Sequence, residues 1–326
     1  MDAARVQVEP PRDRPVLLPP APPPPSPLGH GDAGAGPRRG TFLGLEDDAV
    51  LSRVCNAPIE RVERNRGGTT LSFRVWFLGG GRGLFKPQQR ADVANYRAEL
   101  GAYRMSRLLG VGRVPPACGR RVQRALLQRA ADASGDATFS ARVMTELLGR
   151  GDLVPGAMIH WVPGPLEPVP LVDTWGQLLD LSRPLPPEHT TLAADLSRLV
   201  LFDFLNDNVD RWSGGNILRP RDAAGPGPML YMDNGASFSA MNDGLGARPH
   251  DQAVRLEHVR RFSPTFLRAL RGLSAQGLAA AMAEDPLGPC LSELQVRAVL
   301  TRRDRILAHA AEITAAHGEA DAFVFP

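Results

Sequence analysis

Hydrophobic residues follow two different spacings in the first third of the chain. The runs LSFRVWFL (residues 71–78) and GLFKP (83–87) are rich in β-branched and aromatic residues, and three glycines separate them. Glycines between two such runs are typical of a turn, so we expect a β-hairpin here. Between Val93 and Leu109 the apolar residues instead approximate helical spacing, which predicts an amphipathic helix.

The middle of the chain shows two more apolar runs and then a change of composition. We expect strands at FSARVMTELL (139–148) and AMIHWVP (157–163). The Pro-rich stretch GPLEPVPLV (164–172) follows and is interpreted as the crossing into a mainly helical region. His160 and Trp161, within the second run, are expected to pack in the core, with the lining of an adenine pocket as the alternative.

Serine residues indicate where two helices begin in the C-terminal part. Ser263 followed by Pro264 has the residue types favoured at the N-cap and first helical positions. Ser292 and Gln295 have the spacing of a capping box, which predicts a final helix that runs to about His317.

The first 40 residues differ from everything that follows them. They include PRDRPVLLPPAPPPPSPLG and then a Gly-rich stretch, a composition that cannot bury enough apolar surface to order itself. We therefore expect a disordered tail over residues 1–40. The remaining chain is long enough for a full core, and we divide it into a small lobe over 41–165 and a larger lobe over 166–326.

Charge and cysteine content exclude several classes of protein. The balance of 38 basic and 35 acidic residues gives a net charge of +3 and implies no nucleic-acid partner. The chain has no run of 18 apolar residues and no basic-then-apolar N-terminus, so we expect no membrane span and a cytoplasmic location. Cys55, Cys118 and Cys290 allow one disulfide at most and are expected to be small buried hydrophobic residues.

A single lysine, Lys86, stands among many arginines. A compact ammonium suits a point contact with phosphate, for which guanidinium is a poor substitute, so Lys86 is a candidate nucleotide ligand. Glu99, on the helix that follows, could hold this lysine, although a solvated helix charge is an equal alternative. Gly67 and Gly68 could bring backbone amides close to phosphates, but a plain hairpin turn explains them equally well.

Two acidic motifs follow an apolar helix that we expect over residues 190–205. Asp210 comes first, Asn216 then begins a short apolar segment, and a second apolar segment ends at Asp233. We expect Asp210 to accept the proton of an acceptor hydroxyl, and Asn216 and Asp233 to bind a divalent metal through oxygen.

Several features of these motifs depart from that assignment or leave it open. Asp210 and Asn216 are six residues apart, one more than in the HRDxxxxN loop of protein kinases. Asp, Asn and Gly also dominate ordinary turns. Asp203 and Asp207, near the helix end, are interpreted as solvated charges.

Three stretches together resemble a known family: AELGAYRMSRLLGVGRVPP (98–116), LFDFLNDNVDR (201–211) and YMDNGASF (231–238). They resemble the secretory-pathway kinases of the Four-jointed and Golgi casein kinase group, which share a kinase-like fold with HipA-type and lipid-kinase-like proteins. The resemblance covers roughly residues 67–270. It implies ATP-dependent transfer to a hydroxyl, with Lys86 on the nucleotide, Glu99 near the lysine and the metal, Asp210 catalytic and Asp233 on the metal. Trp212 departs from the group, where His or another basic residue is common.

The chain is therefore predicted to be a two-lobed, kinase-like α+β protein with a small antiparallel lobe that contains one helix. We expect it to use ATP with Mg or Mn, and to act on a protein Ser/Thr or on a glycan or small-molecule hydroxyl. The alternatives are a pseudokinase or nucleotide-binding scaffold, and a toxin-type kinase like HipA. With its few cysteines and no signal anchor, a cytoplasmic, bacterial relative of the group is the expected source.

Overall fold

The computed structural model describes residues 40–326 except 92–93, 170–174, 214, 223–224 and 242–243. The predicted tail therefore lies outside the described residues apart from Gly40, and so does Val93, the expected start of the first long helix.

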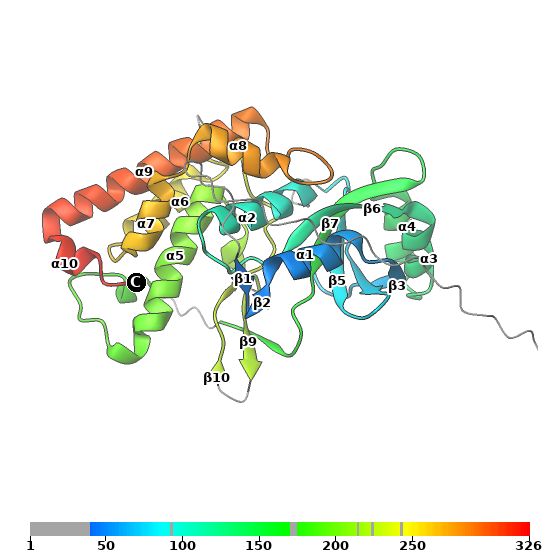
Figure 1. The fold of residues 1–326 in the computed structure, drawn as a ribbon, viewed down its shortest axis with the longest axis horizontal. Helices are drawn as coiled ribbons and strands as arrows, with labels where there is room; N and C mark the ends of the chain where they lie inside the picture. Colours follow the sequence, from blue (N-terminus) through cyan, green and yellow to red (C-terminus); the bar gives the residue numbers. More distant parts are fainter. Residues whose placement is uncertain (1–39, 92–93, 170–174, 214, 223–224, 242–243) are drawn as a thin grey trace, which may run out of the picture. The chain divides into compact units, whose positions relative to one another are not determined.

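The small lobe is built on a five-stranded antiparallel sheet (Figure 1). Its strands lie in the order β3 (Ile59–Arg64), β4 (Phe73–Phe77), β5 (Arg82–Pro87), β7 (Leu153–His160) and β6 (Ala117–Gln123). The predicted hairpin is confirmed as β4 and β5, and the three glycines between them all have positive φ, between 85° and 97°. Alternate residues of β4 are buried, as expected for a strand with one face on a core.

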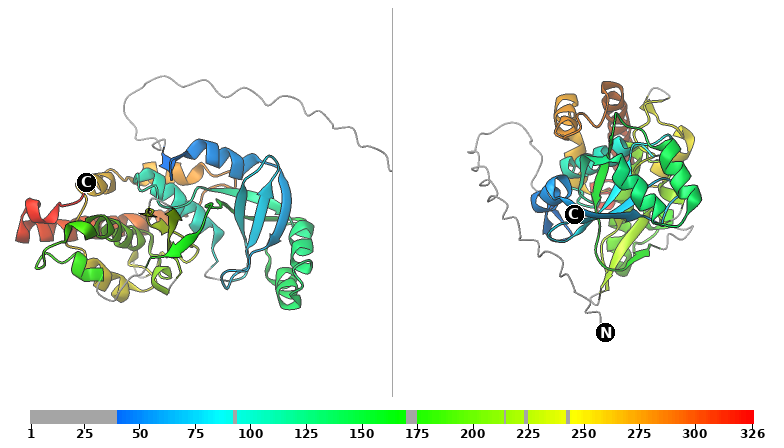
Figure 2. Two further views of the ribbon diagram at one scale, coloured as in Figure 1. Left: turned by 90° about the horizontal axis from the view of Figure 1, so that it is seen from below. Right: turned by 90° about the vertical axis from the view of Figure 1, so that its right-hand side faces the viewer.

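Four helices accompany this sheet, so the prediction of a single helix in the small lobe is wrong: α1 (Asp47–Asn56), α2 (Tyr96–Leu108), α3 (Arg124–Asp132) and α4 (Ala137–Glu146). The predicted strand at 139–148 is wrong, because most of that run forms α4. Asp136 caps this helix by accepting from the Phe139 N–H at 2.9 Å. Phe139 and Val143, four residues apart, are both buried, and α4 lies beside α3 (Figure 2). The apolar residues of this run follow the spacing of a helix and not the alternation of a strand.

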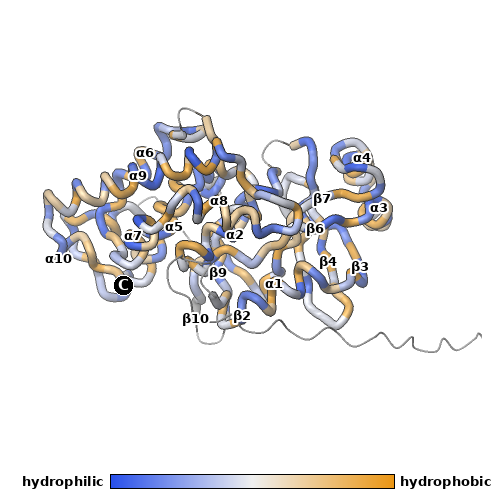
Figure 3. The backbone as a smooth tube through the Cα atoms, turned by 45° about the horizontal axis from the view of Figure 1, so that its top comes forward, coloured by the Kyte–Doolittle hydropathy of each residue, from blue (hydrophilic) through white to orange (hydrophobic). Residues whose placement is uncertain are grey.

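The larger lobe is mainly helical. It contains α5 (Thr190–Asn206), α6 (Pro249–Glu257), α7 (Pro264–Arg271), α8 (Ala275–Ala283), α9 (Glu293–His317) and α10 (Glu319–Ala322). The Ser263 cap and the Ser292 capping box are both confirmed. Along α9 the hydropathy alternates (Figure 3), and buried Val296, Val299 and Ile306 lie on one side. The predicted α+β class is confirmed.

Short strands connect the two parts of the chain. The crossing segment forms β8 (Leu166–Pro168), which pairs with β9 (Ile217–Asp222), and β9 in turn pairs with β10 (Gly225–Pro226) and β11 (Leu230–Tyr231). The remainder of the crossing, from residue 170, lies outside the described residues. A division of lobes between residues 165 and 166 stays a prediction.

The cysteines differ in part from expectation. Cys55, at the end of α1, and Cys118, in β6, form a disulfide with Cα atoms 5.4 Å apart, while Cys290 is free and buried. The first two are therefore bonded rather than merely apolar, because helix α1 packs beside β6 and brings together residues 63 apart in sequence. Within the described ranges, none of the helices has the length and hydropathy needed to cross a membrane.

Candidate active site

Lys86 is the point where three parts of the chain meet. Strand alternation buries Phe85 and Pro87 on one face of β5 and directs Lys86 to the other. Its Nζ donates to Oε1 of Glu99 at 2.5 Å and to Oδ1 of Asp233 at 2.7 Å. The structure thus brings together Lys86, Glu99 and Asp233, three of the residues singled out from the sequence.

The first turn of α2 is fixed close to the Asp233 loop. Asn95 caps α2 by accepting from the Arg97 N–H at 3.0 Å, and its own N–H donates to the carbonyl of Gly235 at 3.2 Å. Glu99 lies in the same first turn and is almost fully buried. Its carboxylate is therefore held against Lys86 by the helix itself rather than by a flexible loop.

The charges in this contact stabilise one another. Burial alone would lower the pKa of Lys86, but the carboxylates of Glu99 and Asp233 outweigh it and raise that pKa above its ordinary value. Burial would raise the pKa of Asp233, yet the neighbouring Lys86 ammonium brings it below the ordinary aspartate range. Lys86 and Asp233 are consequently both charged at neutral pH.

Asp210 and Asn216 face each other across a short turn. The Asn216 Nδ2 donates to the backbone oxygen of Asp210 at 2.9 Å and to its Oδ2 at 3.3 Å. Asn216 immediately precedes β9, and its carbonyl accepts from the Met232 N–H at 3.2 Å, one residue before Asp233. The amide oxygen of Asn216 and the carboxylate of Asp233 thus project from adjacent strand ends, and both are oxygen donors of the kind that Mg²⁺ and Mn²⁺ prefer.

Arg211 is a central residue that the sequence analysis missed. Its guanidinium is fully buried and donates to Asp203 Oδ2 at 3.0 Å, to the Asn216 carbonyl at 3.0 Å and to Asn234 Oδ1 at 2.6 Å. It also donates to the carbonyl of Met232. One side chain therefore links α5 to the residues beside Asn216 and Asp233.

Asp203 and Asp207 are both buried, so their interpretation as solvated charges is wrong. Asp203 pairs with Arg211, and Asp207, in the left-handed conformation with φ 52°, accepts from the Ala247 N–H at 2.9 Å. The segment after Asp233 covers the end of α5, which the helix pattern alone does not reveal. A usable signal was nevertheless present, because Asp203 interrupts the apolar run LFDFL.

Gly67 and Gly68 lie on the exposed loop between β3 and β4. Gly68 has φ 82°, and a side chain there would meet no atom within 4 Å, so conformation rather than crowding favours glycine. Thr70, farther along this loop, lines a small cavity together with Lys86 and Glu99. Contact between the two glycines and phosphate stays a prediction.

His160 packs rather than points into open space. Its ring meets Phe42 edge-on with the centroids 6.1 Å apart, and burial together with the charge of Arg53 lowers its pKa to about 4. This favours the packing interpretation. Trp161 lies under the guanidinium of Arg82 at 5.5 Å.

The segment after Asp233 is anchored to the last long helix. Gln295 donates to the carbonyl of Phe238 at 2.9 Å, and Arg302 donates to the carbonyls of Ser239 and Gly244 at 2.9 and 2.8 Å. These contacts hold the segment after Asp233 against α9 through its backbone carbonyls.

Comparison with known proteins places this geometry in context. No family model matches the chain. Human glycosaminoglycan xylosylkinase is 23% identical over 314 residues, which cover 82% of this chain and 75% of the kinase. The zebrafish (Danio rerio) xylosylkinase is 24% identical over 307 residues, covering 80% and 73%. The human extracellular serine/threonine protein kinase FAM20C is 22% identical over 322 residues, covering 80% of this chain but only 53% of its own length.

Solved structures of similar fold come from the same group. The Golgi casein kinase superposes with a TM-score of 0.67 at 18% identity over 85% of this chain and 77% of its own. The structure of hydra Fam20 with sugar gives 0.68 at 19% identity over 84% and 91%. The resemblance to the Golgi casein kinase group is confirmed. The predicted two-lobed kinase-like fold is confirmed with it, and Figure 1 shows the arrangement in this member of the fold.

Proposed function

We propose that this chain is an ATP-dependent phosphotransferase that moves the γ-phosphate to a hydroxyl acceptor with the help of Mg or Mn. The observation that carries the proposal is the contact of Lys86 with both Glu99 and Asp233, which joins the sheet, α2 and the second acidic motif. The likeness to several kinases supports the same class of enzyme, and a Golgi casein kinase structure with Mn/ADP bound supports the cofactors.

The side chains around Lys86 are suited to separate tasks in this reaction. Lys86 would contact the nucleotide phosphates as a point charge, and buried Glu99 would keep its ammonium in place. Asp233 and the amide oxygen of Asn216 would hold the metal, which when bound neutralises charge on the phosphates. Asp210 would orient the acceptor hydroxyl and take its proton. Gly67 and Gly68 would cover the phosphates with backbone N–H groups.

The longer spacing between Asp210 and Asn216 is the main argument for a pseudokinase. The Asn216 amide nevertheless reaches both the backbone and the carboxylate of Asp210. The turn between them begins with the short 3₁₀ helix η3 (Arg211–Ser213), and Arg211 donates to the carbonyl of Asn216. The geometry therefore supports an active enzyme over a scaffold.

A serine or threonine of a protein is the first candidate acceptor, and a glycan hydroxyl is the second. Trp212, two residues after Asp210, stacks on Trp175 with the ring centroids 5.1 Å apart. Trp175, His258 and Asp180 line a neighbouring cavity of about 580 Å³, within the size range of small-molecule sites. Aromatic faces beside polar side chains suit a sugar ring, and this favours a glycan as the alternative acceptor.

The cytoplasmic location expected from the sequence stays a prediction. The Cys55–Cys118 disulfide argues against it, because such bonds persist in oxidising compartments and are rare in reducing ones. Non-reducing gel analysis of protein trapped with alkylating agent in its native cells would test this. A free Cys55 would agree with a cytoplasmic protein, and a bonded one would count against that location.

Transfer of labelled γ-phosphate from ATP tests the proposed function. The full chain is assayed with Mg and with Mn on dephosphorylated casein, on a xylose-containing glycoside and on itself. Asp210→Asn should lower the rate by about 10² to 10⁴-fold, the range for loss of a general base. Asp304→Asn, at an exposed position of α9, is the matched control and should leave the rate unchanged. Equal rates in wild type and Asp210→Asn would exclude Asp210 as the base.

A further inference from the structure

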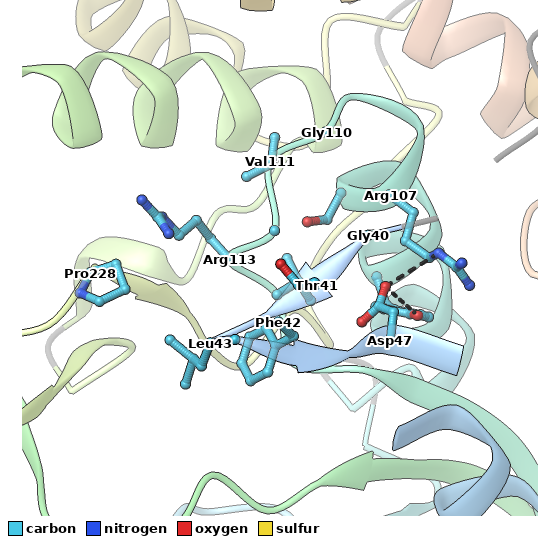
Figure 4. Close-up of a pocket in the computed structure, with 15 residues that line it drawn as sticks. Gly40, Thr41, Phe42, Leu43, Asp47, Arg107, Gly110, Val111, Arg113 and Pro228 are labelled. Atoms are coloured by element: carbon cyan, nitrogen blue, oxygen red, sulfur yellow. Dashed lines mark hydrogen bonds and ion pairs between the residues drawn. The ribbon is translucent and has the colours of Figure 1, made fainter. Parts of the chain in front are cut away.

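A second pocket lies at the end of α2 that is remote from Glu99 (Figure 4). It has a volume of about 430 Å³ and is enclosed by the β1–β2 hairpin (Thr41–Phe42 and Leu45–Glu46), the last turn of α2 and the loop over residues 110–114. Cavities of this size hold small molecules. Ser106, which lines the pocket, follows Glu99 by two helical turns, about 10 Å along the axis. This pocket is therefore distinct from the Lys86 site.

The pocket walls are connected to both carboxylates that hold Lys86. Helix α2 carries Glu99 near its start and presents Ser106 and Arg107 to the pocket near its end. The carbonyl of Arg113, in the loop, accepts from the N–H of Tyr231 at 3.0 Å, two residues before Asp233. One helix and one backbone hydrogen bond thus connect the pocket with the site.

The two arginines of the pocket differ in how far their charges are already compensated. Arg107 is directed to Asp47 at 3.3 Å and to Asp48 at 3.2 Å, as the dashed contacts in Figure 4 show for Asp47. Arg113 has one carboxylate neighbour, Asp195, at 3.4 Å, whereas Arg107 has two; among the described residues the buried Nε makes no hydrogen bond in either arginine. Since guanidinium offers five N–H donors, Arg113 retains capacity for an anionic ligand.

The rest of the lining combines polar groups, among them Thr41, Ser106 and the carboxylate of Asp47 that pairs with Arg107, with apolar surface. Thr41 and Val111 line the pocket beside Arg113, and the Thr41 hydroxyl and the Val111 side chain are drawn there in Figure 4. Phe42 and Pro228 supply further apolar atoms. A ligand that matches this lining carries an anionic group at one end and a compact apolar body at the other.

We propose that this pocket binds a small organic anion, a carboxylate or monophosphate on a compact apolar body, and that its binding favours the position of α2 in which Glu99 holds Lys86. The pocket is open in the same conformation in which that ion pair is formed. A ligand that binds this conformation better than others shifts the population toward it. The regulatory half of the proposal rests on the proposed kinase function, whereas the binding half does not.

Phenyl phosphate is the probe for the binding half, with benzyl alcohol as its neutral counterpart, and titration of the full chain by calorimetry gives the affinity. Arg113→Gln should weaken phenyl phosphate binding at least tenfold, or about 1.4 kcal/mol. Arg219→Gln is the control, because the Arg219 side chain is 27% exposed and pairs with one carboxylate, Glu167, while Arg113 is 26% exposed. The control should change the affinity less than twofold.

Two further variants distinguish this pocket from the nucleotide site. Lys86→Met should leave phenyl phosphate binding intact, and Val111→Trp, which fills the pocket while keeping Arg113, should abolish it. Asp195 keeps Arg198 as a partner at 3.5 Å in Arg113→Gln, so that variant is expected to fold. Loss of binding in Lys86→Met, unchanged affinity in Arg113→Gln or Val111→Trp, or equal affinity for benzyl alcohol would each overturn the proposed site.

The regulatory half is tested by the KM for ATP. Saturating phenyl phosphate should lower this KM severalfold in the wild type and not in Arg113→Gln. By linkage, a non-hydrolysable ATP analogue should tighten phenyl phosphate binding by the same factor as the probe tightens binding of the analogue. An unchanged KM with the probe bound would refute regulation. Complete absence of phosphate transfer would refute the kinase function, and the binding titrations would still decide whether the pocket takes an anion.

Discussion

Two ion clusters flank the Asp233-Asn234 loop, and they are built differently. In the first, Lys86 bonds to Glu99 and to Asp233, whose side chain is 44% exposed. In the second, Arg211 is completely buried and bonds to Asp203, to two backbone carbonyls and to Asn234. The first cluster can be reached by a ligand, whereas the second is closed to solvent and saturated with partners.

This difference separates groups that can take part in chemistry from groups that position them. A half-exposed carboxylate can release Lys86 and bind a metal, since water and ligand compensate for the lost contact. A buried guanidinium with all of its partners inside the protein has no such freedom, because each broken bond leaves an unpaired charge in a low-dielectric interior. We infer that Arg211 is a positioning residue.

Arg211→Met is expected to have the largest effect on stability. It leaves Asp203 buried without its partner, and breaking such a pair costs about 3–5 kcal/mol. Urea unfolding measures the loss. Arg142→Met is the comparison, because Arg142 pairs with Glu146 one helical turn away at a partly exposed position and should cost about 0.5 kcal/mol. Equal losses would show that burial does not distinguish the two pairs.

The variant Lys86→Met should lose nucleotide binding and should lose less stability than Arg211→Met. Binding of Mg·ATP is expected to weaken at least tenfold, because the phosphate contact is lost. The free energy of unfolding should fall by about 3 kcal/mol, the lower end of the range for breaking a buried pair, because Glu99 stays buried without its partner while Asp233 can be hydrated. Fluorescent nucleotide titration and urea unfolding of the same protein provide both values. A larger loss of stability than in Arg211→Met would contradict the comparison.

Acid pH should have a smaller effect than either substitution on the free energy of unfolding, through the contribution of the Lys86 cluster. The pKa of Asp233 is lower in the folded protein than its unfolded value of about 3.9, so its contribution is present above that pH and is lost as the pH falls below it. The raised pKa of Lys86 leaves its contribution constant throughout this range. The free energy of unfolding, measured between pH 3 and 6, should therefore depend less steeply on pH in Asp233→Asn than in the wild type. Identical slopes would mean that the Lys86 contact does not lower this pKa.

Local patterns predicted much of the fold. The β4–β5 hairpin followed from glycines between apolar runs, and α5, α7 and α9 followed from helical spacing and serine caps. Such features depend on residues within one or two turns of each other, so the chain encodes them locally. The failure at α4 is of the same kind, because Phe139 and Val143 fit a helix as well as a strand until the cap at Asp136 is included.

Candidate site residues were also recoverable from local signals. Lys86 is the single lysine, and Asp210, Asn216 and Asp233 each adjoin a short apolar run. Their residue types were sufficient to suggest phosphate and metal contacts. The sequence could not show that Lys86 would reach Glu99 and Asp233 together, because Asp233 is 147 residues away from it in the chain.

By itself the sequence determined the residue types of the site, the kinase-like resemblance and the positions of α2, α5, α7, α9 and the β4–β5 hairpin. Only the tertiary structure decided that Arg211, Asp203 and Asn234 form a closed network, that Cys55 and Cys118 are bonded, and that a pocket adjoins the far end of α2. The physical reason is the same in each case. Burial and pairing of a charged or reactive group depend on which distant segments cover it, and residue spacing along the chain carries no information about that.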